Sequence, residues 1–361
     1  MARTKIKLPK PLWVVVVPII AWISFAGKGI GGFYNIFLAA ELIVCVLAAV
    51  HHAHVVALRV GEPFGALVLA LAVTAIEVVL IISLMLTPGH DTTTLARDAV
   101  FAAEMIILTG IVGDSLVLGG AKFKEQKFRL DGVSASLTVL TAISVLTLIL
   151  PNYTLSTPGP FYNDKQLAFV AVVSLLLYGT FLIVQTISHR NYFLPEGNEK
   201  NEEAHATPPT NKATGISLVF LLISLAAVIV LAEVLAPGVE SGLDKMGAPK
   251  SLAGIIIAMV VLLPEGLSAL RAARQNQLQS SLNLSLGSAL ASIGLTIPAV
   301  AFVSLMKGLP LTLGIDTKST VLFLLSLFIV LLSLRTGRTT LLQGVVMLVV
   351  FAVYLFITMV P

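Results

Sequence analysis

Two glutamates lie inside long apolar segments of the chain, where an ionised side chain is costly. Glu77 lies near the middle of the apolar stretch 64–87, and Glu265 lies about one helical turn from the middle of the stretch 251–270. If both stretches are membrane-spanning helices, each carboxyl group lies roughly 6 Å or less from the membrane midplane. A charge at that depth costs at least about 2.5–3.5 kcal/mol on insertion scales. Each acid must therefore be protonated, paired, or exposed to a hydrated cavity.

A pair of buried carboxylates has the chemistry that a cation exchanger needs. Two acids that share a site can hold one cation between them. When the cation leaves, their mutual repulsion favours the binding of protons. Because the cation and the protons then occupy the site in turn, Glu77 and Glu265 predict cation/proton antiport, with Ca²⁺, Na⁺ or K⁺ as the transported ion.

Further oxygen ligands are available beside both glutamates. Pro264 lacks an N–H group, so the Val260 carbonyl loses its helical donor and becomes a candidate ligand, although an ordinary proline kink is the alternative. Calcium takes six to eight oxygens, and carbonyl, hydroxyl and amide oxygens supply them. Residues 285, 288 and 292 share one helical face, although membrane serines often bond their own backbone. The candidate side-chain ligands besides the two acids are Thr74, Thr109, Asn283, Ser285, Ser288 and Ser292.

Other titratable groups, near the ends of the apolar stretches or within the stretch 95–120, suit proton access or gating. His51, His52 and His54 form a cluster at the cytoplasmic end of the second stretch that can relay protons or sense pH, and a zinc site is the alternative. No further His or Cys lies close to this cluster in the sequence, which disfavours zinc. The candidate access or gating residues are His51, His52, Glu104, Asp114, Glu233 and Glu240.

The elements that must hold these residues are membrane helices. Apolar residues make up 57% of the chain and occur in runs that are too long for soluble helices. Segments such as 140–150 and 321–332 are apolar almost throughout, unlike the alternating strands of a barrel. Since a span needs about 20 apolar residues, the sequence predicts an all-α membrane protein with about eleven spans. They lie near 12–27, 33–57, 64–87, 95–120, 133–150, 167–187, 215–236, 251–270, 282–306, 318–334 and 340–360.

The distribution of basic residues predicts the orientation of these spans. With the N-terminus in the cytoplasm, the cytoplasmic segments hold sixteen of the 23 Lys and Arg residues. Positive residues concentrate on the cytoplasmic side of membrane proteins. We therefore expect a cytoplasmic N-terminus and a periplasmic C-terminus in a bacterial inner membrane.

The spans divide into two halves of opposite orientation. The segment 65–77 aligns without gaps on 253–265, and Glu77 then falls on Glu265. Five spans per half, an odd number, force the halves to be inverted. The predicted organisation is an N-terminal segment with the first helix at 1–32, one five-helix repeat at 33–187, an acidic cytoplasmic linker at 188–214 and a second five-helix repeat at 215–361. The linker is either a solvated tether or a segment that attracts cations.

Composition excludes several other classes of protein. Cys45 is the single cysteine, so neither an intrachain disulfide nor a thiolate metal cluster can form. The basic residues are spread over loops rather than gathered in one stripe, so nucleic acid binding has no support. No Ser/His pairing at helical spacing and no His-Glu-x-x-His motif is present, which disfavours an enzyme. The expected partners are inorganic cations, protons and the lipid bilayer, without a cofactor.

Several motifs resemble the calcium/cation–proton exchanger family of the calcium/cation antiporter superfamily. They are Leu58-Arg-Val-Gly-Glu-Pro-Phe-Gly65 before the Glu77 helix, Ala232-Glu233 with Glu240 before the Glu265 helix, and the segments 156–162 and 192–196. The likeness covers essentially residues 33–360 and is greatest to bacterial inner-membrane members that exchange sodium, potassium or calcium for protons. It implies that Glu77 and Glu265 bind the cation and protons in turn, while flanking helices slide to alternate access.

One departure from the family bears on which cation is carried. The family motif is Gly-Asn-Ala-x-Glu, whereas the corresponding positions here read Val73-Thr-Ala-Ile-Glu77 and Val261-Leu-Leu-Pro-Glu265. Loss of two amide oxygens lowers the ligand count and favours sodium or potassium over calcium unless the Val260 carbonyl and the serines compensate. The alternatives are therefore a monovalent cation/proton antiporter with little calcium activity and, in a different class, a cation channel.

Overall fold

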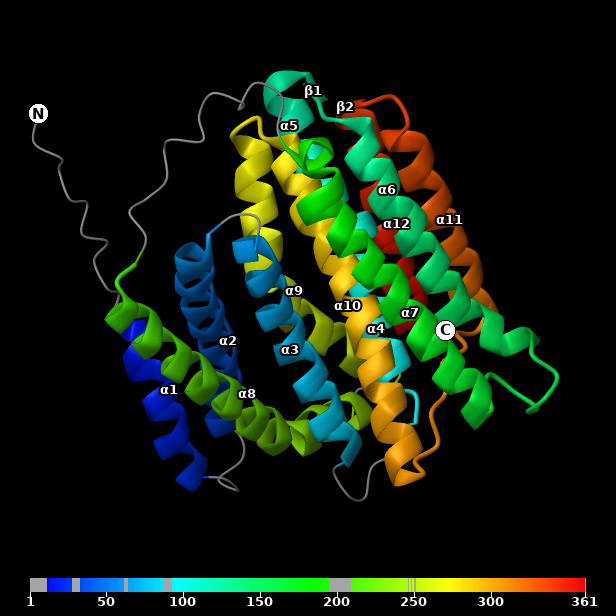
Figure 1. Cartoon of the computed structure of the whole chain (residues 1–361). Helices are drawn as coiled ribbons and strands as arrows, with labels where there is room; N and C mark the ends of the chain where they lie inside the picture. The colour runs from blue at the N-terminus through cyan, green and yellow to red at the C-terminus, as the bar shows by residue number, and fades with distance from the viewer. Residues whose placement is uncertain are drawn as a thin grey trace, which may run out of the picture.

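The apolar stretches of the chain form the helices of a membrane protein (Figure 1). The computed structural model describes residues 12–27, 33–61, 64–86, 93–194, 209–245, 247, 249 and 251–360. Within these ranges, nine helices are long and apolar enough to cross a membrane, and Trp13–Ser24 and Ala70–Leu86 are shorter apolar helices. The predicted all-α membrane fold is confirmed. The N-terminal basic residues and most of the linker, 195–208, lie outside the described residues.

The first half of the chain forms helices α1 to α7, and three of its spans change helical type along their length. A π-helical segment, Ile106–Ile111, joins α4 to α5 within one continuous span, Leu95–Phe123. Similar π-helical segments continue α6 as Val145–Ile149 and α7 as Val184–Ser188. The helices are α1 Trp13–Ser24, α2 Phe33–Val60, α3 Phe64–Leu86, α4 Leu95–Met105, α5 Val112–Phe123, α6 Leu130–Ser144 and α7 Asp164–Ile183.

The second half forms helices α8 to α12. Helix α8 is 35 residues long and contains Pro237, while α9 contains Pro264 directly before Glu265. Helix α10 ends where Gly308 adopts a left-handed conformation, which a residue without a side chain tolerates. The helices are α8 Asn211–Lys245, α9 Ser251–Arg274, α10 Leu278–Lys307, α11 Thr317–Leu334 and α12 Leu341–Met359.

A short antiparallel ribbon joins two connections that the sequence does not predict to be paired. Strand β1, Glu125–Lys127, follows α5, and strand β2, Arg338–Thr340, precedes α12. Gln126 lies opposite Thr339 in this ribbon. At the other end of the bundle, the amides of Leu313 and Gly314 donate to the carbonyl of Pro160 at 3.3 and 3.1 Å. Backbone hydrogen bonds thus tie connections at both ends.

The helices pack around two apolar clusters, with α10 between several of them. One cluster contains residues of α1, α2, α3 and α8, and the other contains residues of α3 to α7 and α9 to α12. Figure 1 shows α1, α2 and α8 together on one side, away from α6, α11 and α12. Helix α10 contacts α3, α4, α6, α7 and α9. Side chains that α3, α9 and α10 turn toward one another therefore lie inside the bundle.

Candidate cation site

Glu77 and Glu265 are both tied to α10 by serine hydroxyl groups. The Ser292 hydroxyl donates to Glu77 Oε1 at 2.6 Å. The Ser288 hydroxyl donates to Glu265 Oε2 in the same way. Ser288 and Ser292 lie one helical turn apart, a rise of about 6 Å along the axis. The two carboxylates that the sequence pairs are thus held on consecutive turns of the same helix, and their charges interact.

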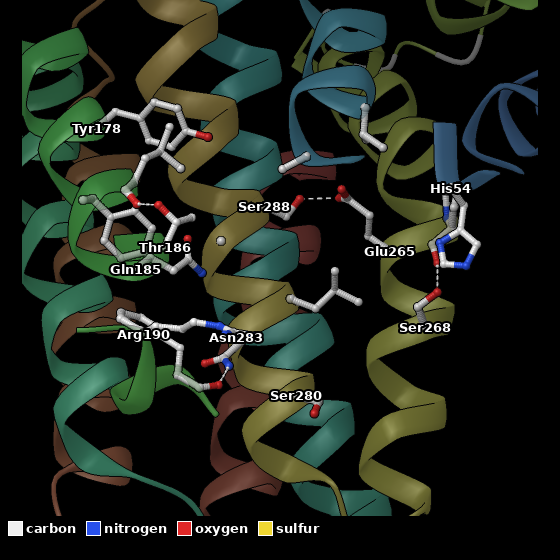
Figure 2. A pocket seen from close by; sticks show the side chains of 18 of the residues that line it. His54, Tyr178, Gln185, Thr186, Arg190, Glu265, Ser268, Ser280, Asn283 and Ser288 are labelled. Carbon is white, nitrogen blue, oxygen red and sulfur yellow. Dashed lines mark hydrogen bonds between the residues drawn. The ribbon is translucent and has the colours of Figure 1, made fainter. Parts of the chain in front are cut away.

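A cavity of about 530 Å³ reaches Glu265 from one end of the bundle. Figure 2 shows Ser288 beside Glu265, with Asn283 and Arg190 to one side of them and His54 to the other, and all five residues line the cavity. The residues that line it include Ser288 and Glu265 but neither Glu77 nor Ser292. Only 6% of Glu77 is exposed. The pair is therefore asymmetric, since one carboxylate faces the cavity and the other is enclosed.

Glu104 adds a third carboxylate to the interior. It lies in the last turn of α4 before the π-helical segment and is completely buried. Among the described residues, neither of its oxygens has a hydrogen-bond partner. Its charge interacts with that of Glu77. Because an unpaired carboxylate is costly in such a place, this group needs a proton, a cation or water to be accommodated.

The other candidate ligands occupy more varied places. The hydroxyl of Thr109 donates to the Met105 carbonyl at 2.5 Å, and that of Ser285 donates to the Ser281 carbonyl at 2.9 Å. Asn283 lines the cavity, where its side-chain amide donates to the Phe193 carbonyl. Thr74 is buried on α3, one turn before Glu77. Thr109 and Ser285 thus bond their own helices, and the structure pairs only Ser288 and Ser292 of this set with the glutamates.

The histidine cluster divides between two surroundings. His52 Nε2 lies 3.1 Å from the Val14 carbonyl of α1, and its ring stacks on Phe220 of α8 with centroids 5.5 Å apart. His51 is half-buried beside it. His54 instead lines the cavity. His54 is thus the histidine of this cluster that lines the cavity. Helical spacing could have singled it out, because His54 follows His51 by about one helical turn.

The remaining access candidates lie farther from the cavity. Glu233 of α8 is exposed and accepts a hydrogen bond from the Ser83 hydroxyl of α3. Asp114 is exposed on α5. Glu240 belongs to α8, and its side chain lies outside the described part of the chain. Sequence reasoning did not select Gln185, Ser268 and Ser280, which also line the cavity, because isolated polar residues near helix ends carry no distinctive pattern.

Comparisons with known proteins identify the family and the fold of this chain. The model of the family described as sodium/calcium exchanger protein matches residues 30–187 and 216–360. The putative ionic transporter y4hA of Sinorhizobium fredii is 46% identical over 324 residues, which cover 90% of this chain and 88% of the relative. The sodium-potassium/proton antiporter ChaA of Escherichia coli is 36% identical over 323 residues, covering 89% and 87%. The solved structure of native YfkE superposes with a TM-score of 0.75 at 15% identity, covering 97% of this chain and 99% of that one.

The family match and the antiporter relative place this bundle of membrane helices among the secondary transporters rather than the enzymes. The chain belongs to the sodium/calcium exchanger family, whose model matches most of its length. It is a cation/proton antiporter of this family and a multi-pass membrane protein.

Proposed function

We propose that Glu77 and Glu265 bind the transported cation and protons in turn, and that this exchange exports Ca²⁺, Na⁺ or K⁺ against protons. The observation that carries the proposal is the attachment of both carboxylates to consecutive turns of α10 through Ser292 and Ser288. Two carboxylates held in this way cannot both remain charged and empty without strong repulsion. A cation between them or protons on them relieves that repulsion.

The cavity supports alternating access at this pair. Glu265 is reached from one end of the bundle while Glu77 is enclosed, so a cation from that side meets Glu265 first. The cavity opens among the ends of α2 and α7 and the start of α10, beside the basic Arg190. Since basic residues concentrate on the cytoplasmic side, we assign this end to the cytoplasm of a bacterial plasma membrane, with the C-terminus outside. The candidate groups for proton passage remain His51, His52, Glu104, Asp114, Glu233 and Glu240.

The arrangement of the connections supports two inverted halves, 33–187 and 215–361, after the N-terminal segment 1–32 and around the linker 188–214. Strand β1 lies in the connection between the third and fourth spans of the first half. It pairs with β2, which lies in the connection between the fourth and fifth spans of the second half. At the opposite end, Leu313 and Gly314 lie in the connection between the third and fourth spans of the second half. Their amides donate to the carbonyl of Pro160, which lies between the fourth and fifth spans of the first half. A two-fold axis in the membrane plane exchanges these two pairings.

A monovalent cation is the second candidate substrate. Thr74 and Leu262, both buried, occupy the places of the two family asparagines, so the site offers fewer amide oxygens than a full calcium shell uses. The relative that is 36% identical is named a sodium-potassium/proton antiporter. In place of those amides, the Val260 carbonyl, which Pro264 leaves without an N–H donor, adds one ligand for either ion.

Proton release from inverted, respiring membrane vesicles tests the function and the substrate together. A pH-sensitive dye reports proton efflux when calcium, sodium or potassium chloride is added in separate trials. A response to micromolar calcium identifies a divalent site, and a response only to millimolar sodium or potassium identifies the monovalent alternative. Silence to all three refutes cation/proton exchange.

Matched glutamine variants test the two glutamates. Glu77→Gln and Glu265→Gln remove charge at nearly constant volume and should each abolish exchange while the protein still inserts. Glu41→Gln is the control because Glu41 is an equally buried acid on α2 that bonds Ser24 of α1 instead. Normal exchange in either site variant, or equal loss in the control, would contradict a shared carboxylate site.

A further inference from the structure

One end of the bundle carries a concentration of basic side chains that cation exchange does not use. They come from the end of α5 and the connection from α5 to α6, which contains β1, from the end of α9, and from the connection between α11 and α12, which contains β2. We call this set the basic rim; it comprises Lys122, Lys124, Lys127, Arg129, Arg271, Arg274, Arg335 and Arg338. All are exposed except Arg129, which is half-buried. Three connections that are distant in the sequence therefore contribute to one surface.

Hydrogen bonds hold these connections together. The Lys122 ammonium group donates to the Arg274 carbonyl at 3.0 Å. The buried amide of Gln126 donates to the Ala273 carbonyl at 3.1 Å and to Asn276 Oδ1 at 3.0 Å. Figure 1 shows β1 and β2 at the same end of the bundle as the connection between α9 and α10. These hydrogen bonds fix the basic rim to the end of α9, the helix that carries Glu265.

Positive charge on the rim is poorly compensated by the protein itself. Lys127 lies directly opposite Arg338 in the ribbon, a like-charge pairing that is unfavourable across two strands. Arg338 reaches Glu125 at 3.5 Å. The side chains of Lys124, Lys127 and Arg335 have no hydrogen bond or ion pair in the described part of the chain. Lys124 also has a φ of 68°, a positive value that a lysine adopts only at a cost.

The opposite end of the same helices is charged differently. There Arg97 pairs with Asp98 at 2.8 Å, and Lys318 lies 4.0 Å from Asp316. Lys165 follows Asp164 at the start of α7. Basic and acidic residues therefore alternate at that end, whereas the rim gathers basic residues almost alone. This contrast agrees with the concentration of basic residues on the cytoplasmic side of membrane proteins, and it places the rim at the surface of the cytoplasmic leaflet.

The rim borders apolar surface that faces the hydrocarbon. Leu130, at the start of α6, is 40% exposed, and Leu341 and Leu342, directly after β2, are 41% and 67% exposed. Side chains next to such surface lie at the depth of lipid headgroups, where each Lys or Arg gains from anionic lipid. We propose that the basic rim binds the phosphate groups of anionic phospholipids in the surrounding leaflet and so stabilises the contact between β1 and the end of α9.

Thermal unfolding of the full-length protein in detergent tests this proposal. Phosphatidylglycerol should raise the unfolding temperature, whereas phosphatidylcholine should leave it unchanged. In the variant Lys124→Gln/Lys127→Gln/Arg335→Gln, half-saturation should require on the order of 100-fold more phosphatidylglycerol, because each lost charge weakens binding several-fold. The matched control is Lys165→Gln/Lys307→Gln/Lys318→Gln at the opposite end, which should respond like the unmodified protein.

Several outcomes would overturn the proposal. An unchanged phosphatidylglycerol response in the rim variant shows that the lipid binds elsewhere. An equal effect of millimolar inorganic phosphate identifies a free-anion site instead of a lipid site. If the rim variant unfolds earlier even in phosphatidylcholine, native mass spectrometry decides by counting retained phosphatidylglycerol molecules: fewer on the rim variant than on the control supports lipid binding, and equal numbers refute it.

Discussion

Two regions of this antiporter are held together by different kinds of contact. The group α4 to α7 with α10 to α12 is tied by backbone hydrogen bonds at both ends, through the β1–β2 ribbon and through Pro160 with Leu313 and Gly314. The group α1, α2 and α8 packs through apolar side chains and a few side-chain hydrogen bonds, such as His52 to the Val14 carbonyl. Glu77 and Glu265 lie on α3 and α9, between the two groups.

The difference indicates which region can move. Paired backbones slide only if several hydrogen bonds break together, whereas helices in apolar contact can shift by small sliding steps. The backbone-tied group is therefore expected to act as a frame, with α1, α2 and α8 as the part that shifts. Such a shift would open and close the paths to Glu77 and Glu265 while α10 holds both carboxylates through its serines.

A bridge between α8 and α3, the helix that carries Glu77, should have the largest effect. In a Cys45→Ala background, Ser83→Cys and Glu233→Cys place one thiol on α3 and one on α8, at side chains that are hydrogen-bonded to each other. A short, reducible bifunctional thiol reagent should lower exchange far below the rate of the untreated double-cysteine variant, and reduction should restore that rate. The same treatment of Glu125→Cys with Thr340→Cys, which are paired within the ribbon, should leave exchange intact. Exchange that continues in the bridged α3–α8 variant would show that no movement occurs there.

Removal of the serine hydroxyls should weaken cation binding. A hydrogen bond to a charged group contributes about 1.5–3 kcal/mol, so Ser292→Ala and Ser288→Ala should each change the apparent cation affinity by roughly ten- to a hundredfold. Ser224→Ala on α8 is the control, since that hydroxyl donates to the Phe220 carbonyl of its own helix at 2.7 Å. Initial rates of proton release against cation concentration measure the effect. If the apparent cation affinities of the two serine variants equal that of the control, the serine hydroxyls of α10 do not contribute to the cation site.

Glycine variants should distinguish the tight packing of the frame from the open surface of α8. A Cβ atom at Gly344 of α12 would lie 2.7 Å from both the Gly113 carbonyl oxygen and the Val117 amide nitrogen of α5, so Gly344→Ala should cost about 1–3 kcal/mol of stability. A Cβ atom at the exposed Gly215 of α8 would meet nothing within 4 Å. Gly215→Ala should therefore stabilise the helix slightly, by about 0.5–1 kcal/mol. Thermal unfolding of the two variants in the same detergent measures both changes in stability. Equal shifts of the unfolding temperature would argue against a difference in packing between α12 and this surface of α8.

Loss of the His52 hydrogen bond should have the smallest effect. His52→Phe keeps an aromatic ring against Phe220 but removes the partner of the Val14 carbonyl, which Pro18 already deprives of a helical donor. The expected cost is about 1 kcal/mol, the net value of one hydrogen bond. Hydrogen exchange of the α1 amides should rise while that of α12 stays constant. A rise in both helices would mean that the two groups unfold as one unit.

The amino-acid sequence by itself determined the all-α membrane fold and the presence of one acid inside each of two apolar stretches. Hydropathy is a property of each segment of about 20 residues, so the spans can be found without knowing their neighbours. The cost of an intramembrane charge likewise marks Glu77 and Glu265 before any partner is known.

The tertiary structure decided how those helices are rotated and paired. Rotation of α10 selects Ser288 and Ser292 as partners of the glutamates and leaves Ser285 bonded to its own helix. Packing also turns His52 toward α1 and His54 toward the cavity. The β1–β2 ribbon joins residues more than 200 positions apart. Such choices depend on which helices meet, and a local pattern in the sequence carries no record of a distant partner.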